Sequence, residues 1–169
     1  CNHATLSGHS CHHEVETARI FGVLGNVDAN TGDPQIGWDT DQFMTDVREA
    51  TLIMHTVIKN GGIAPGGFNF DAKLRRESTS YEDLMIAHIV GMDTLAHGLR
   101  NAAKMHEEGL LDELVKERYK SWDSDLGTMI NTGKKTLKQL SAIALLDPTE
   151  RPVPSAKQER AEQILSYYA

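Results

Sequence analysis

Residues 23–30 read VLGNVDAN, and this stretch decides the fold, because a short apolar run turns abruptly polar within it. Such a pattern is typical of a buried strand that emerges at a functional rim. Residues 68–71 read FNFD, alternate like a second strand and again end on a carboxylate. Two strands are therefore predicted, and each carries polar side chains at its carboxyl end.

Helical patterns flank both strands. Apolar residues recur at helical spacing over residues 10–21, 45–59 and 80–108, and a loop is expected over residues 31–42. The alternation of helix and strand predicts a parallel sheet. Two strands cannot close such a sheet, since a (β/α)₈ barrel takes about 250 residues. The remaining strands are therefore expected from an N-terminal barrel half that is missing from this chain.

The β signal ends at Gly109. Short amphipathic segments follow it and predict helices over residues 110–122, 126–131, 136–145 and 157–168, with a linker that contains Pro148, Pro152 and Pro154. The predicted fold class is therefore α/β. Residues 1–108 are expected to form the last βα units of a TIM barrel, and residues 109–169 are expected to form an all-helical C-terminal arm that serves oligomerisation.

Charge and composition exclude some classes of partner. A formal net charge of −7 gives no reason to expect nucleic acid or an anionic membrane surface. No apolar run approaches the ~20 residues that span a bilayer, and no secretion signal is recognisable. Cys1 and Cys11 form no C-x-x-C motif, so neither a disulfide framework nor a structural zinc site is indicated. A cytoplasmic location is expected, and the start at Cys1 rather than Met suggests a fragment.

Hard metal ligands occur where strands are expected to end. Side chains at the carboxyl ends of different barrel strands converge on one pocket. Carboxylates gathered there repel one another unless cations neutralise them, and oxygen-rich sites suit magnesium or manganese. An imidazole among them shifts the preference toward manganese or cobalt. The predicted metal ligands are His3, Asp28, Asp39, Asp41 and Asp71.

Single residues of these types also have simpler explanations. An Asp at a strand-to-loop junction is commonly a turn former or a helix N-cap, and Asp33 and Asp46 are interpreted in this way. Taken alone, His3 is a solvated terminal residue, and His88 within its apolar segment is a core or interface histidine. An EF-hand that begins at Asp28 is excluded, because the turn glycine and the bidentate glutamate of that loop are both missing.

Longer motifs extend these observations. They are NHATLSGH at residues 2–9, VDANTGD at 27–33, GWDTD at 37–41, GFNFDAK at 67–73 and GMD at 91–93. Together and in this order they closely resemble xylose isomerase. The resemblance runs through about residue 122 and is weaker beyond it.

The resemblance implies an aldose–ketose isomerase that interconverts D-xylose and D-xylulose, and also D-glucose and D-fructose, by a hydride shift. It also implies a homotetramer with two divalent ions, which are Mg²⁺, Mn²⁺ or Co²⁺. Asp28 and Asp71 match ligands of the structural ion, and His3, Asp39 and Asp41 match ligands of the catalytic ion. The family's bridging glutamate and catalytic His/Asp pair have no counterpart in this sequence. No catalytic residue is therefore assigned, and the isolated chain is expected to be inactive.

Two other functions remain open at this stage. The chain could be an inactive assembly module that binds an N-terminal half or a sister subunit through its helices. It could also come from a related barrel isomerase or epimerase that acts on another sugar, because most substrate contacts are expected in the missing half.

Overall fold

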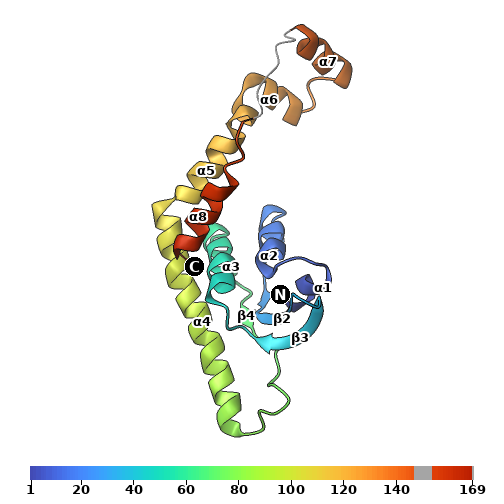
Figure 1. Ribbon diagram of the computed structural model, residues 1–169. Helices are drawn as coiled ribbons and strands as arrows, with labels where there is room; N and C mark the ends of the chain where they lie inside the picture. Colours follow the sequence, from blue (N-terminus) through green and yellow to red (C-terminus); the bar gives the residue numbers. More distant parts are fainter. Residues whose placement is uncertain (147–153, 169) are drawn as a thin grey trace. The chain divides into compact units, whose positions relative to one another are not determined.

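The computed structural model describes residues 1–146 and 154–168, and it divides the chain into two compact units. The first unit comprises Cys1–Glu108 together with Leu165–Ala169, and the second comprises Gly109–Ile164 (Figure 1). Pro148 and Pro152 of the predicted linker lie outside the described residues. The candidate metal ligands all belong to the first unit.

Three helices of the first unit begin where the sequence predicts. They are α2 (Cys11–Ile20), α3 (Val47–Lys59) and α4 (Tyr81–Glu108). Each start has a side-chain cap, which satisfies backbone N–H groups that the helix itself leaves free. The caps are Ser10, which accepts from the His13 N–H, Asp46, which accepts from the Arg48 and Glu49 N–H groups, and the reciprocal pair Ser80 and Asp83. The N-cap interpretation of Asp46 is thereby confirmed.

A short helix at the beginning of the chain was not predicted. Residues Asn2 and His3 were expected to follow a strand, but they open α1 (Asn2–Leu6) instead. The Cys1 backbone nitrogen donates a hydrogen bond to the Asp28 carbonyl oxygen at 3.0 Å, which fixes the start of this helix beside the first strand. The helix therefore carries His3 to the rim from outside the sheet.

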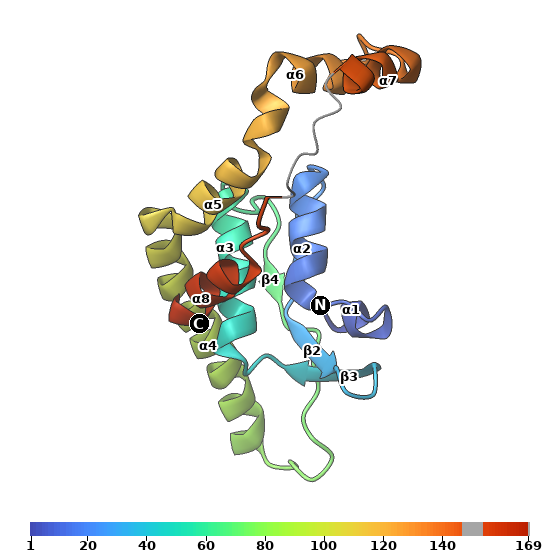
Figure 2. The same cartoon turned by 45° about the horizontal axis from the view of Figure 1, so that its top comes forward.

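The predicted parallel pairing is confirmed, over a shorter length than expected. Strand β1 (Val27–Asp28) pairs in parallel with β4 (Phe68–Asn69), with Val27 opposite Phe68 and Asp28 opposite Asn69. Strand β4 of this pair lies between α2 and α3 in Figure 2. Parallel pairing brings the carboxyl ends of both strands to the same edge.

The predicted loop over residues 31–42 is wrong. Strands β2 (Asn30–Asp33) and β3 (Trp38–Phe43) form an antiparallel hairpin there. The turn is built locally, because the Asp33 side chain accepts a hydrogen bond from the Gln35 N–H at 2.9 Å and Gly37 has a φ of 61°. Asp33 is thus a turn former, as interpreted from the sequence. The hairpin was not recognised from the sequence, because the mostly polar residues of β2 and β3 lack the apolar alternation of an ordinary strand.

The core of the first unit lies between α3, α4 and the strands. Figure 1 shows α3 alongside the middle of α4. A Cβ atom added to Gly98 on α4 would stand 2.6 Å from the backbone carbonyl carbon of Ala50 on α3. The backbones of the two helices therefore approach each other closely at Gly98, where a side chain would not fit. The buried cluster consists of Cys11, Val15, Ala29, Met44, Ala50, Ile53, Met54, Leu95 and Ala102.

The first half of α4 leaves apolar side chains exposed within the described unit. Met85, Ile86 and Ile89 are 63%, 49% and 48% exposed. His88 is also exposed within this unit, so the core interpretation is wrong, whereas the interface interpretation stays a prediction. Its Nδ1 lies 2.9 Å from the Leu84 carbonyl oxygen, and its ring packs edge-on against Phe43 and Phe70.

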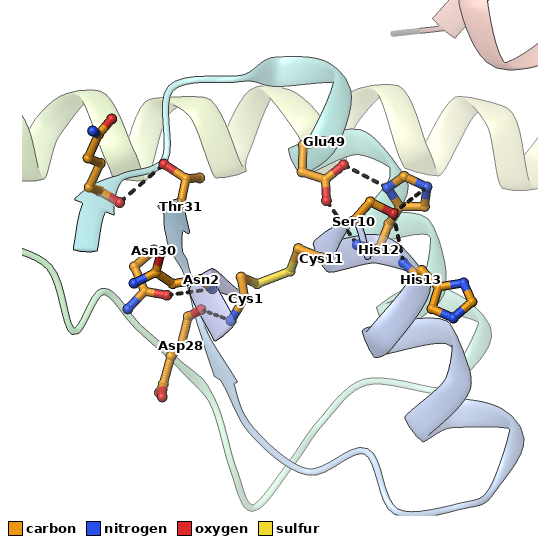
Figure 3. Close-up of a disulfide and its surroundings, with 11 residues drawn as sticks. Cys1, Asn2, Ser10, Cys11, His12, His13, Asp28, Asn30, Thr31 and Glu49 are labelled. Carbon is orange, nitrogen blue, oxygen red and sulfur yellow. Dashed lines mark hydrogen bonds and ion pairs between the residues drawn. A yellow bond between two sulfur atoms is a disulfide. The ribbon is translucent and has the colours of Figure 1, made fainter. Parts of the chain in front are cut away.

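The sequence argument against a disulfide is also wrong. Cys1 and Cys11 are joined by a disulfide (Figure 3). The chain turns back between α1 and α2, and this turn brings the two Cα atoms to 4.6 Å, which is within the range that a disulfide bridges. Cys11 is 8% exposed and belongs to the buried cluster, so the bond fastens the start of α1 to the core.

All regular structure in the described part of the second unit is helical. It contains α5 (Leu110–Tyr119), the 3₁₀ helix η1 (Lys120–Asp123), α6 (Asp125–Asn131), α7 (Leu137–Leu146) and the first part of α8 (Gln158–Tyr168). The Lys157 ammonium lies 3.0 Å from the Glu117 carboxylate and ties the start of α8 to α5. None of the described helices combines the length and the apolar character that crossing a membrane requires.

Candidate metal centre

Two of the predicted ligands follow the parallel strands. Asp28 ends β1, and Asp71 lies two residues beyond the end of β4. Because Asp28 is paired with Asn69, both carboxylates lie at the carboxyl edge of the same strand pair. The Asn69 amide nitrogen donates to Asp28 Oδ1 at 2.7 Å. Asp28 and Asp71 therefore lie at the carboxyl ends of two paired strands, as predicted, and their role as metal ligands stays a prediction.

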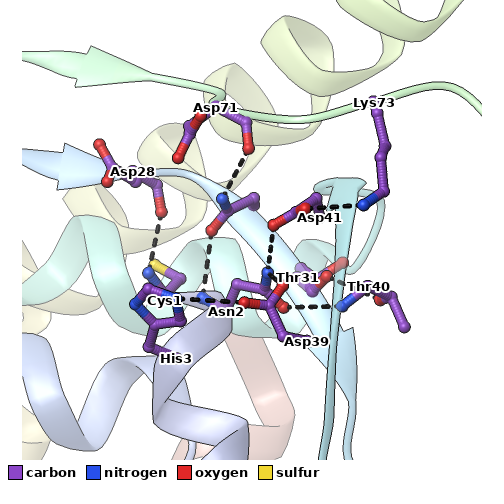
Figure 4. A network of polar contacts seen from close by, with 11 residues as sticks. Cys1, Asn2, His3, Asp28, Thr31, Asp39, Thr40, Asp41, Asp71 and Lys73 are labelled. Carbon is purple, nitrogen blue, oxygen red and sulfur yellow. Dashed lines mark hydrogen bonds and ion pairs between the residues drawn. The ribbon is translucent and has the colours of Figure 1, made fainter.

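The other three ligands come from the hairpin and the first helix. Asp39 and Asp41 lie on β3, separated by one residue, and side chains with this spacing share a face of a strand. His3 on α1 has its Nε2 atom 3.1 Å from Asp39 Oδ2. Figure 4 shows these side chains together with Asp28 and Asp71. The fold thus brings residues from four segments to one rim.

A lysine to which the sequence analysis gave no role adds a positive charge beside these carboxylates. Lys73 Nζ lies 2.8 Å from Asp41 Oδ2. The hydrogen bond from Lys73, together with one shared with Asp39, holds the pKa of Asp41 below its usual range, and the Asp41 carboxylate raises the pKa of Lys73. The ion pair keeps Asp41 ionised, which is the form that a metal ion requires.

The backbone is also unusual at the rim. Asp41 and Asp71 have φ angles of 46° and 39°, in the left-handed region that residues other than glycine seldom adopt. Asp tolerates this region better than most residues, and such conformations occur preferentially at functional sites. At Asp71 the turn is held by Asn30, whose amide nitrogen donates to the Asp71 carbonyl oxygen at 2.8 Å.

A second missed residue lies between the hairpin and the helix. Asn2 is 2% exposed, and its amide nitrogen donates to the carboxylates of Asp39 and Asp41, the latter at 2.6 Å. The sequence placed Asn2 in a ligand-bearing segment but gave it no task. Its partners lie 37 and 39 residues further along the chain, so no local signal could have identified them.

The chemistry of these side chains fits hard divalent cations. One imidazole and four carboxylates converge on a rim where a single lysine, Lys73, forms an ion pair with them in the described part of the chain. Such a donor set suits Mg²⁺, Mn²⁺ or Co²⁺. Within residues 1–146 and 154–168, no three of the five ligands bring ligand atoms within 4.8 Å of one another. The ligands therefore share one rim without closing on one point.

Comparison with known proteins identifies a family match for the C-terminal residues. The family model of the XylA2 C-terminal domain matches residues 115–169. The chain is also 69% identical to a xylose isomerase of Arabidopsis thaliana and 65% identical to one of Hordeum vulgare, each over 164 residues. A xylose isomerase of Yersinia pestis (strain Pestoides F) is 50% identical over 167 residues.

These matches cover almost the whole chain but only part of each relative. They include 97% of the chain for the two plant proteins and 99% for the bacterial one, against 34% and 38% of the relatives' own lengths. The chain thus spans about a third of the curated relatives that it matches. The resemblance predicted from the motifs is confirmed: the chain matches the C-terminal portion of xylose isomerases.

Proposed function

We propose that the chain supplies the metal-binding rim of an aldose–ketose isomerase that interconverts D-xylose and D-xylulose, and also D-glucose and D-fructose. In this proposal residues 1–108 are the last βα units of a (β/α)₈ barrel. Residues 109–169 are a helical arm that contacts a neighbouring subunit in a homotetramer. The parallel pairing of β1 with β4 supports the barrel assignment, because all barrel strands are parallel.

Two divalent ions would be held by two groups of side chains. Asp28 and Asp71 are assigned to one ion, and His3, Asp39 and Asp41 to the other. When bound, such ions act as Lewis acids that polarise the sugar oxygens. The side chains of this chain set the position and charge of the site, and Asn2 donates a hydrogen bond to Asp41.

The observation that carries the proposal is the approach of His3, from α1, to within 3.1 Å of Asp39 on β3, beside Asp41. The imidazole comes from α1 and the two carboxylates come from β3. A role in a turn or a helix cap would not explain why these three side chains are gathered, whereas a metal site would. The identity of 50–69% to xylose isomerases over nearly the whole chain supports the same assignment.

We further propose that this chain is inactive by itself and works in the cytoplasm with an N-terminal barrel half. No group that touches the reacting atoms of the sugar is assigned within residues 1–169. The exposed Met85, Ile86 and Ile89 of α4 suit a surface that the rest of a barrel or another subunit covers. The same surface favours the alternative of an assembly module without activity.

The test uses the full-length protein and measures xylulose formation with and without added Mg²⁺ or Mn²⁺. Asp41→Asn and His3→Ala are expected to lower kcat by more than the roughly 10- to 100-fold that loss of an outer-shell partner costs. Asp33→Asn is the matched control, because Asp33 lies in the same hairpin and keeps a turn-forming side-chain oxygen. Full activity without any divalent ion, or full activity of Asp41→Asn, would contradict the proposal. An active N-terminal half in the absence of this chain would favour the assembly module.

A further inference from the structure

We propose that Asn2 is a positioning residue that holds the carboxylates of Asp39 and Asp41 in register with His3. The inference rests on the proposed function, since it concerns the same metal centre. It assigns to a neutral amide the task of gathering charged ligands before any ion binds. Asn2 precedes His3 on α1 and lies directly against the β3 hairpin (Figure 4).

Both polar atoms of the Asn2 side chain are engaged. Its amide nitrogen donates to Asp39 Oδ1 and to Asp41 Oδ1, the second at 2.6 Å, and its amide oxygen accepts from the Thr40 N–H at 3.2 Å. Its own backbone N–H donates to Asn30 Oδ1 at 3.1 Å. One side chain therefore contacts three successive residues of β3, which a residue that merely fills space has no reason to do.

The neutrality of the amide suits this task. Two carboxylates on one strand face repel each other, and a hydrogen-bond donor shared between them offsets that repulsion. A lysine at this position would compete with a divalent ion, and an aspartate would add a further negative charge. An apolar residue would remove the donor that Asn2 supplies to Oδ1 of Asp39 and Oδ1 of Asp41, which is costly where these atoms are partly buried. Asparagine meets all three requirements, because it donates and accepts without carrying charge.

The hairpin is shaped to receive this side chain. A Cβ atom at Gly32 would lie 2.7 Å from Asn2 Oδ1 and 2.6 Å from the Trp38 carbonyl oxygen. Only a residue without a side chain leaves room there for the Asn2 amide. Gly32 therefore gives the Asn2 amide the room to reach β3.

Asn30 extends the arrangement to the other ligand group. It is 3% exposed, accepts from the Asn2 backbone and donates to the Asp71 carbonyl oxygen at 2.8 Å. Asn2 contacts ligands of only one proposed ion, whereas Asn30 links both groups. Replacing Asn2 should therefore affect one ion selectively, while replacing Asn30 should affect both.

The experiment titrates the metal-free, full-length protein with Co²⁺ and follows both Kd, by calorimetry, and the visible absorption spectrum of the bound ion. Asn2→Ala is expected to weaken the site of His3, Asp39 and Asp41 by about 10- to 100-fold and to shift its spectrum, as loss of an outer-shell partner does. The site of Asp28 and Asp71 should keep its Kd. Asn2→Ser, which retains one donor, should show a smaller loss.

The matched control is Asn101→Ala. Asn101 also donates a side-chain hydrogen bond in the first unit, to Thr51 Oγ1 at 3.3 Å, but it lies on α4 away from the rim. Its removal should leave both Kd values and the spectrum unchanged. Circular dichroism and the thermal midpoint report whether each variant folds, and Asn2→Ser serves if Asn2→Ala does not.

The possible failures are distinguishable. If the unaltered protein binds no Co²⁺, the metal centre itself is wrong, and this inference falls with it. If the unaltered protein binds two ions and Asn2→Ala binds both with the same Kd and spectrum, only the positioning role is overturned. An equal loss at both sites that parallels a loss of thermal stability would also overturn it, because a purely structural residue behaves in that way.

Discussion

Lys73 meets Asp41 twice, once through its side chain and once through its backbone. Its Nζ atom lies 2.8 Å from Asp41 Oδ2, and its backbone N–H donates to the Asp41 carbonyl oxygen, also at 2.8 Å. The two side chains are 68% and 35% exposed, so solvent weakens the ion pair. The ammonium nevertheless occupies Oδ2, one of the two carboxylate oxygens of Asp41 that a metal ion could bind.

Replacing Lys73 with Met should therefore strengthen metal binding. An exposed ion pair contributes little, so removing the competing cation should tighten Mn²⁺ binding only modestly, by at most about fivefold. Calorimetric titration of the full-length protein measures this change. Arg76→Met is the control, since it removes the same charge from the same loop. Weaker Mn²⁺ binding by Lys73→Met would show that the lysine supports the site rather than competing with it.

Reducing the Cys1–Cys11 bond should destabilise the protein. A disulfide that closes a loop of this length contributes about 2 to 3 kcal/mol, mainly by restricting the unfolded chain. Urea unfolding with and without dithiothreitol should show this difference, and the Cys1→Ser, Cys11→Ser double variant should be insensitive to the reductant. Two free thiols in the unreduced protein would contradict the bond. They would agree with the proposed cytoplasmic location, where disulfides are rare.

Gly98→Ala should separate two packed helices. The new methyl group would stand 2.6 to 2.8 Å from backbone and Cβ atoms of Ala50 and Thr51, which cannot move independently of α3. We expect a loss of about 1 to 3 kcal/mol of unfolding free energy in urea titrations. Gly91→Ala is the comparison, because its methyl group would meet the ring of Phe70, and a side chain can turn aside. Equal stability of Gly98→Ala and the unaltered protein would contradict the close packing.

Tyr168 should make stability depend on pH in alkaline solution. Its hydroxyl donates to the Glu108 carboxylate, and this hydrogen bond, with burial, raises the pKa of Tyr168 to about 12. A raised pKa favours the protonated form in the folded state, so this contribution is complete below the ordinary pKa of 10.0 and is lost as the pH rises toward about 12. Thermal midpoints across this range should fall further for the unaltered protein than for Tyr168→Phe. Tyr167→Phe, at a residue that is 70% exposed, should follow the unaltered protein.

The features that sequence predicted well are local ones. Helix starts at Ser10, Asp46 and Ser80 were readable because a cap and the backbone it satisfies lie within a few residues. The two parallel strands were recognised by an apolar run that ends on Asp28 and by an alternation that ends on Asp71. Such signals need no knowledge of the rest of the fold.

The features that sequence missed depend on distant partners. The β2–β3 hairpin has mostly polar side chains, so its sequence shows no alternation of apolar and polar residues. The pairing of Asn30 with Phe43 therefore leaves no signal in the sequence. The Cys1–Cys11 bond depends on a turn between two helices, of which one was not predicted. The role of Asn2 depends on residues more than thirty positions away, so it became visible only once the rim had been assembled.

The return of the chain to the first unit changes how the second should be understood. Glu108 and Leu165 both belong to the first unit, so the larger part of the proposed arm, Gly109–Ile164, is an insertion in the sequence of that unit. Lys104 Nζ lies 5.2 and 6.0 Å from the ring centroids of Tyr167 and Tyr168. These contacts hold the last turn of α8 against α4. A stop codon anywhere in the insertion would also delete part of the body that carries the metal ligands. Excising Gly109–Ile164 and joining Glu108 to Leu165 by a short linker would leave that body complete.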